Sequence, residues 1–225
     1  MLDRETILKV ATECYPESAR ATKLFAEVGQ RVRDSGCLEL EELVKIANWK
    51  SYLAGHHTKG NGNEVVRDLT RKAFEQADAG QVTSAVRTLV WDGSAGLRGV
   101  RTRMASTILT VYDPKRYIVM DVRALASLTR HGLEDLSPPL RADAWLALNE
   151  PATYEGYLLA CRNLNADLGI NDLRALDRCL WALAGRTVQE MRDEECIQEG
   201  KPFCGRHDAE DCPCAHVCAG GAESD

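Results

Sequence analysis

Apolar residues recur every three or four positions along most of this chain, which is the spacing of helices that bury one face. There are six such stripes, and Pro151, a residue that suits the first position of a helix, precedes the fifth. Only Tyr-Ile-Val-Met at 117–120 has a strand-like composition, and it is too short for a sheet. The sequence therefore predicts an all-α fold. The stripes are Ala21, Leu24, Phe25, Val28 and Val32 within 17–34; Leu40, Leu43, Val44, Ala47 and Leu53; Val65, Leu69 and Phe74; Val82, Val86 and Leu89; Tyr154, Leu158, Cys161 and Leu164; and Leu173, Leu176, Leu180 and Leu183.

Turn-forming and capping residues indicate where some of these helices begin and end. The second helix is expected to end near Gly55, before the Gly-Asn-Gly-Asn turn at 60–63. The pair His56 and His57 would then lie in a loop. Asn171 is predicted to be the N-cap of the last helix, because its side chain can accept a hydrogen bond from the first turn.

Composition places the chain among soluble globular proteins, with 225 residues, 28% of them charged and 44% hydrophobic. No segment approaches the roughly 18 apolar residues needed to span a membrane, and the N-terminus lacks the apolar core of a signal peptide. We therefore expect a cytoplasmic protein with reduced thiols that acts as a monomer away from membranes. Its net charge of −6 is carried by residues 191–225, where nine acids meet three bases.

The remaining chain is neutral but contains one basic stretch, over 98–123, with six bases against two acids, Asp113 and Asp121. Local positive charge favours nucleic-acid binding, because neutralising phosphates releases counterions. A solvated, charged helix face is the alternative that charge alone leaves open. The six bases are Arg98, Arg101, Arg103, Lys115, Arg116 and Arg123.

The stretch LRGVRTRMASTILTVYDPKRYIVMD, residues 97–121, combines a glycine turn, a helix and a single acid. Backbone N–H groups at the start of the helix after such a turn can bind a phosphate, with Arg101 and Arg103 beside them. A plain corner between two helices would use the same glycines. The turn alone does not decide between the two interpretations.

The continuation resembles the helix-hairpin-helix DNA glycosylase superfamily, which includes endonuclease III and the adenine glycosylases. The matching residues are Leu97, Gly99, Val100, Ala105, Ile108, Leu109 and Asp121. The resemblance implies a two-lobed helical bundle with a helix-hairpin-helix motif at 97–109, Asp121 in the cleft between the lobes, and duplex DNA as the partner. The expected segments are 1–30, N-terminal helices packed on the C-terminal lobe; 31–121, the central bundle; 122–195, the C-terminal helical lobe; and 196–225, a Cys-rich metal loop with an acidic tail.

The same resemblance implies that Asp121 stabilises a sugar cation while a damaged, mismatched or modified base is cut from DNA. The alternative is that Asp121 only caps the helix that follows it and takes no part in a reaction. Gly99, Val100, Arg101 and Arg103 would bind the DNA backbone, although Arg101 replaces the second glycine of the hairpin. Arg103 stands where bifunctional members carry the lysine that forms a Schiff base, which an arginine cannot form. A monofunctional enzyme with water as nucleophile is therefore expected, unless a lysine such as Lys50 or Lys59 reaches the site.

Cysteines gather at the C-terminal end, five of the nine within 196–218. Thiolates clustered on an acidic tail in a reducing compartment indicate a metal site. Cys204, Cys212, Cys214 and Cys218 occupy the place of the [4Fe–4S] cluster of endonuclease III-like proteins, and four thiolates suit such a cluster. Zinc is the alternative, with His207 or His216 as a further ligand, and Cys196 can replace one of the four. The scattered cysteines, expected in the core, are Cys14, Cys37, Cys161 and Cys179.

Two other functions compete with base excision. One is a non-catalytic helix-hairpin-helix DNA-binding protein with a structural metal site, and the other is a helical scaffold whose metal tail binds a protein. Salt-dependent duplex binding would distinguish the glycosylase and the DNA-binding protein from the scaffold. Base release would distinguish the glycosylase from the DNA-binding protein. The sequence does not identify the base.

Overall fold

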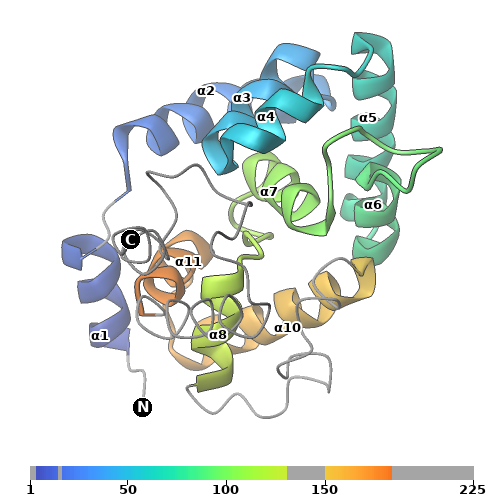
Figure 1. Ribbon diagram of the computed structural model, residues 1–225. Coiled ribbons are helices and arrows are strands. Elements are labelled where there is room, and N and C mark those ends of the chain that lie inside the picture. Colours follow the sequence, from blue (N-terminus) through green and yellow to red (C-terminus); the bar gives the residue numbers. More distant parts are fainter. Residues whose placement is uncertain (1–3, 15–16, 131–149, 184–225) are drawn as a thin grey trace, which may run out of the picture.

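The structure, a computed structural model, describes residues 4–14, 17–130 and 150–183 (Figure 1). These residues form helices and no β-strand, which confirms the all-α prediction. The elements are α1 (Arg4–Lys9), the π-helical turn η1 (Val10–Cys14), α2 (Ala19–Ser35), α3 (Leu40–Lys50), α4 (Tyr52–Thr58), α5 (Asn63–Asp78), α6 (Val82–Leu89), α7 (Thr102–Tyr112), α8 (Val122–Arg130), α10 (Pro151–Asp167) and α11 (Leu173–Leu183).

The helices fall into two groups, with α7 at their centre (Figure 1). The upper group in this view holds α2 to α6, and the lower group holds α1, α8, α10 and α11. Helix α7 packs against α2, α3, α5 and α6 from one group and against α10 from the other. Both α1 and η1 pack against α11, whereas α2 packs against α3 and α7. The limits of the four expected segments stay a prediction.

Helix α2 shows how closely a stripe and its caps can define a helix. The Ser18 hydroxyl accepts a hydrogen bond from the Ala21 N–H over 3.2 Å and caps the first turn. At the other end, the Gly36 N–H donates to the Val32 carbonyl over 2.8 Å. Four of the five predicted stripe residues are buried, and the fifth, Phe25, packs edge-on against Trp49 with ring centres 5.6 Å apart.

The second predicted helix is two helices, and this difference bears on the site. Helix α3 begins with a capping box at Glu39 and ends at Lys50, and α4 begins at Tyr52. Ser51 between them is extended, with φ −167° and ψ 136°. The prediction of one helix ending near Gly55 rests on Leu53, which lies beyond this residue and six positions after Ala47. The break leaves Lys50 at the C-terminus of α3, where the helix dipole favours a cation.

Helix α4 folds back onto α3, and Gly55 makes this possible. A Cβ on Gly55 would lie 1.8 Å from the Asn48 Oδ1 and 3.3 Å from the Asn48 Cα, so a side chain there would displace the Asn48 side chain and crowd the backbone of α3. Gly55 therefore lies inside a helix and does not end one. The pair His56 and His57 also lies in α4, and the prediction of a loop at these residues is wrong.

The last helix is capped by Asp172 and not, as predicted, by Asn171. The Asp172 Oδ1 accepts hydrogen bonds from the N–H groups of Arg174, over 2.9 Å, and Ala175, over 3.1 Å. Asn171 has φ 57°, in the left-handed region that asparagine tolerates better than most residues. The prediction was displaced by one residue because both side chains suit a cap.

The stripes meet in one apolar core with buried residues from the helices of both groups except α4, whose Ala54 is partly buried and packs against it. Within α5, Phe74 is buried as predicted, but Val65 is exposed and its neighbour Val66 takes the inward position. Cys37, Cys161 and Cys179 are buried, as expected of small core residues, whereas the side chain of Cys14 lies outside the described part. Within the described ranges, no helix combines the length and apolar character that a membrane crossing requires.

Candidate functional site

The chain turns sharply just before α7. The Val100 N–H donates to the Leu97 carbonyl over 2.9 Å, and Gly99 has φ +79°, as the third residue of a type II turn requires. A Cβ on Gly99 would lie 2.8 Å from the His57 Cβ and 3.0 Å from the Thr58 nitrogen. Glycine is therefore needed here for two reasons, the backbone conformation and the contact with the end of α4.

A second residue, Asn61, holds this turn from the other side. Its Oδ1 accepts from the Arg98 N–H over 2.8 Å, and its Nδ2 donates to the Arg98 carbonyl over 3.0 Å. The same Nδ2 also donates to the Thr58 carbonyl over 2.7 Å. The Gly-Asn-Gly-Asn sequence predicts a turn, but only the tertiary structure reveals that one asparagine satisfies both backbone groups of Arg98.

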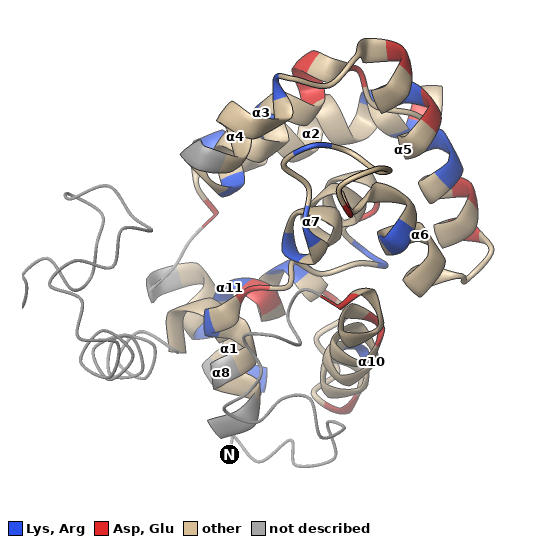
Figure 2. Cartoon of the chain, turned by 45° about the vertical axis from the view of Figure 1, so that its right-hand side comes forward, with Lys and Arg blue, Asp and Glu red and all other residues tan. Residues whose placement is uncertain are grey.

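Three arginines surround the turn. Arg98 and Arg101 are exposed, and both touch Trp91: the Arg98 guanidinium lies 5.6 Å from the ring centre, and the Arg101 Nη1 donates to the Trp91 carbonyl over 3.1 Å. Arg101 is the N-cap residue of α7 but makes no side-chain cap bond to the first turn. Arg103 is partly exposed in that turn. Basic segments thus lie on the loop into α7 and at its start (Figure 2).

The segment 117–120 is buried and belongs to no helix or strand, and side chains from two helices bond to its backbone. The Met120 N–H donates to the Ser106 Oγ on α7 over 2.9 Å. The hydroxyls of Tyr154 and Tyr157 on α10 donate to two carbonyls of the segment, each over 3.1 Å. These bonds replace those of a strand partner, and they fix the position of the residue that follows.

That residue is Asp121, and its two carboxylate oxygens have different partners. Oδ1 accepts from the Arg123 N–H over 2.9 Å and caps α8, as the sequence predicts for a cap. Oδ2 accepts from the Lys50 Nζ over 2.7 Å, and each of these two side chains is 20% exposed. Asp121 therefore lies where α3 of one group meets α8 of the other, and capping occupies only half of its carboxylate.

The surroundings of Asp121 keep it ionised. Burial by itself would raise the pKa of Asp121, but the charge and hydrogen bond of Lys50 outweigh it. The Arg123 N–H and the charge of Arg103 act in the same direction, and together they lower the pKa to about 2. At neutral pH the group is a carboxylate that two cations face.

A second carboxyl, Asp177 on α11, belongs to the same electrostatic cluster. Burial raises its pKa to about 6, although the charges of Arg174 and Lys50 oppose that shift. Asp177 also forms an ion pair with Arg174, which in turn binds Glu17 over 2.6 Å. The charges of Asp121 and Asp177 therefore act on each other, and one carboxyl is held ionised while the other titrates near neutral pH.

Of the two lysines that the sequence leaves as candidates, the structure brings one to Asp121. Lys50 reaches it because α3 ends there, whereas Lys59 is exposed at the C-cap of α4. Sequence reasoning could not choose between them, since neither lies near position 121 along the chain. The break at Ser51, which the apolar pattern hides, is the local feature that orients the lysine.

The predicted metal ligands Cys204, Cys212, Cys214 and Cys218 lie outside the described residues. Within the described ranges, no group of three or more His, Cys, Asp and Glu side chains is arranged to hold a metal ion. The metal site therefore stays a prediction.

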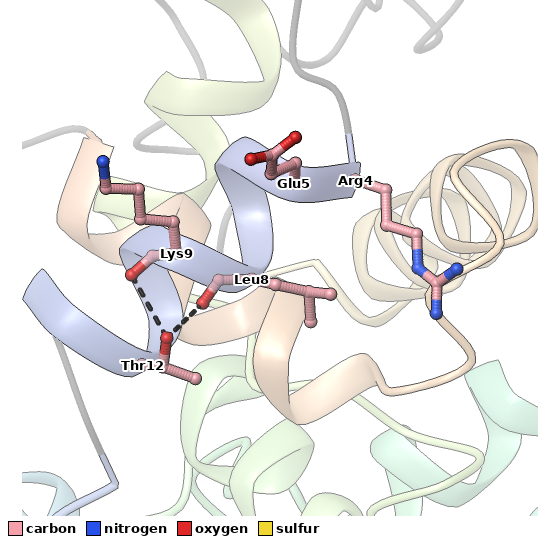
Figure 3. A pocket seen from close by; sticks show the side chains of 5 residues that line it. All are labelled: Arg4, Glu5, Leu8, Lys9 and Thr12. Carbon is pink, nitrogen blue, oxygen red and sulfur yellow. Dashed lines mark hydrogen bonds between the residues drawn. The ribbon is translucent and has the colours of Figure 1, made fainter.

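A shallow hollow lies on the surface of α1 and η1. Arg4, Glu5, Leu8, Lys9 and Thr12 line it (Figure 3). The Thr12 hydroxyl donates to the Leu8 carbonyl over 2.7 Å. The hollow shares no residue with the surroundings of Asp121 and takes no part in the function proposed below.

Comparisons with protein-family models, curated proteins and solved structures find no match to this chain. The proposal that follows therefore depends on the residues themselves.

Proposed function

We propose that this protein is a DNA glycosylase that hydrolyses the N-glycosidic bond of a damaged, mismatched or modified base. The observation that carries the proposal is Asp121, a partly exposed carboxylate with a pKa of about 2, held by a hydrogen-bonded segment between two groups of helices. A capping residue needs neither the ion pair with Lys50 nor this position. The turn at 97–100 and its arginines add a means of holding DNA next to it.

The chemistry requires a fixed negative charge. As the base departs, positive charge builds on the sugar, and a carboxylate that is already ionised stabilises it without reorganisation. Each oxygen of Asp121 already accepts one hydrogen bond, Oδ1 from the Arg123 N–H and Oδ2 from Lys50, so a second lone pair on the partly exposed carboxylate would orient the attacking water. The target nucleotide has to leave the base stack to reach this position.

The turn and the start of α7 would bind the DNA backbone. Gly99 lies close to the N-terminus of α7, which attracts phosphate, whereas the Val100 N–H is bonded to the Leu97 carbonyl, so Val100 would hold the turn in place beside the DNA. Arg101 is exposed, and its guanidinium would take the place of the backbone contact that a glycine at 101 would permit. Arg103, in the first turn of α7, is close enough to Asp121 for its charge to help lower the pKa of that residue.

The Cys-rich tail would hold a structural metal group. The thiolates of Cys204, Cys212, Cys214 and Cys218 form a donor set that fits a [4Fe–4S] cluster. A zinc ion is the alternative to the cluster. The metal group would stabilise the folded tail, because metal binding is coupled to folding. No step of base excision depends on the metal.

The experiment is a panel of duplexes that each contain one damaged, mismatched or modified base. After incubation with the purified full-length protein, heating in alkali cleaves the strand wherever a base has been removed. Strand breaks with at least one duplex, dependent on the protein, are expected. Salt-dependent duplex binding without any break would instead identify a non-catalytic DNA-binding protein, and absence of both would favour the scaffold.

A further inference from the structure

Trp91 lies beside the turn before α7, and the proposed function does not use its side chain. It follows α6 at the start of the loop into α7, and this loop projects from the helices in Figure 1. Trp49 packs against the apolar core, whereas Trp91 is partly exposed and is not among the described residues that form or contact that core. The indole of Trp91 therefore has surface that a ligand can cover.

Hydrogen bonds hold the backbone of Trp91 against the turn. Its N–H donates to the Val100 carbonyl over 2.9 Å, and its carbonyl accepts from the Arg101 Nη1 over 3.1 Å. The ends of the loop also approach closely, because a Cβ on Gly96 would lie 2.0 Å from the Val90 carbonyl oxygen. Since this backbone is already fixed, a ligand that binds to the indole has little chain to order.

Two arginines with no acidic partner in the described part of the chain lie at Trp91. The Arg98 guanidinium is 5.6 Å from the ring centre, and Arg101 binds the carbonyl of the same residue. The one carboxylate of the loop, Asp92, is engaged within it, because its Oδ1 accepts from the N–H groups of Ser94 and Ala95 over 2.8 Å each. Both arginines are therefore available to an anion.

An aromatic face beside arginines is an arrangement that binds single-stranded nucleic acid. A base stacks on the ring, and a guanidinium binds a phosphate of the same strand. In a paired duplex, neighbouring base pairs already cover both faces of each base. The indole can therefore stack only on a base that has left the duplex stack.

We propose that Trp91 and Arg98 form a stacking site for an unpaired DNA base, next to the phosphate that Arg101 would bind. The base would extend the stack that the Arg98 guanidinium and the indole already form. This inference rests on the proposed function for its partner, DNA, and adds a substrate class. Duplexes with unpaired bases beside the target nucleotide should bind more tightly than fully paired ones.

The test compares two single strands of about ten units, a length within the range that such sites cover. One strand is oligothymidylate, and the other carries a stable abasic sugar at every position, so the two have equal charge and differ only in their bases. Fluorescence anisotropy measures the binding of the full-length protein to each end-labelled strand at one salt concentration. Trp91→Leu removes the ring and Trp91→Phe keeps one. Leu159→Ala is the control, because Leu159 is an exposed apolar residue on α10.

We expect the parent to bind oligothymidylate at least about fivefold more tightly than the abasic strand, as stacking of one base on an aromatic side chain provides. Trp91→Leu should abolish this preference and leave the affinity for the abasic strand unchanged, because the arginines remain. Trp91→Phe and Leu159→Ala should keep the preference. Equal affinities in the parent would overturn the inference. So would a Trp91→Leu variant that keeps the preference, or one that weakens binding of both strands equally, since the ring would then only support the turn.

Indole fluorescence is a second measurement, which does not depend on the folding of Trp91→Leu. A base stacked on the indole quenches its emission, so oligothymidylate should quench the parent and the abasic strand should not. Trp91→Phe should bind oligothymidylate with most of this quenching lost. Undiminished quenching in Trp91→Phe would place the base at another tryptophan and refute the site.

The alkali assay separates this result from the proposed function. Base release by a parent without any preference for oligothymidylate retains the glycosylase and refutes the stacking site. The preference without base release from any duplex supports the stacking site and contradicts base excision.

Discussion

Replacing Gly99 with alanine should destabilise the protein by about 2–4 kcal/mol. Two effects contribute. An alanine with φ near +79° occupies the left-handed region, which costs about 1 kcal/mol or more. Its Cβ would also lie 2.8 Å from the His57 Cβ and 3.0 Å from the Thr58 nitrogen, and overpacking of this kind costs about 1–3 kcal/mol. Because Thr58 contributes a backbone atom, the neighbour cannot simply rotate away.

Gly36→Ala is the matched control, because it separates the two effects. Gly36 has φ +70° at the end of α2, but a Cβ there would meet no atom within 4 Å. Only the backbone cost applies, so this variant should lose about 1 kcal/mol. The difference of about 1–3 kcal/mol between the two variants measures how closely the turn approaches α4.

The assay is urea unfolding at 25 °C, followed by far-ultraviolet circular dichroism, with the free energy of unfolding taken from the linear extrapolation. The slope against urea should be the same for all three proteins, since the surface exposed on unfolding does not change. If Gly99→Ala and Gly36→Ala lose the same free energy, the turn does not rest on α4 and this account of the site's geometry is wrong.

Three further predictions concern charge, DNA binding and metal. Since the pKa of Asp121 falls from 3.8 to about 2 on folding, its ~2 kcal/mol of stabilisation is present above about pH 4 and lost towards pH 2; in urea unfolding, Asp121→Asn should lack this acid-dependent part. Arg101→Ala and Arg103→Ala should each lower the salt dependence of duplex binding by about one, with equal losses for all sequences; altered base preference would contradict this. Fresh protein should be brown, with absorbance near ~400 nm, and Cys212→Ser should reduce metal content whereas Cys37→Ser should not. Colourless protein with bound zinc would favour the alternative metal.

The sequence predicts helices well where an apolar stripe agrees with caps at both ends. Ser18 and Gly36 bracket α2 in this way, and Pro151 opens α10. It fails where the stripe continues across a break. The predicted stripe extends across Ser51 to Leu53, and only the fold of α4 onto α3 shows that there are two helices here.

The candidate site could be predicted only in part, because its members approach each other in the tertiary structure alone. Asp121 is prominent in the sequence as the single acid after an apolar run. Lys50 and Asp177 are ordinary charged residues on helices, 71 and 56 positions away along the chain from Asp121. Asn61 belongs to a recognisable turn, yet its bonds to Arg98 depend on two loops meeting.

The most direct test of the central claim is single-turnover base release by Asp121→Asn, on whichever duplex of the panel the parent protein cleaves. Asparagine caps a helix about as well as aspartate, so the variant should stay folded and bind duplex DNA as the parent does. Loss of the negative charge should slow base release on the order of a hundredfold or more. Release at the parent's rate would return Asp121 to a purely structural role and contradict the account.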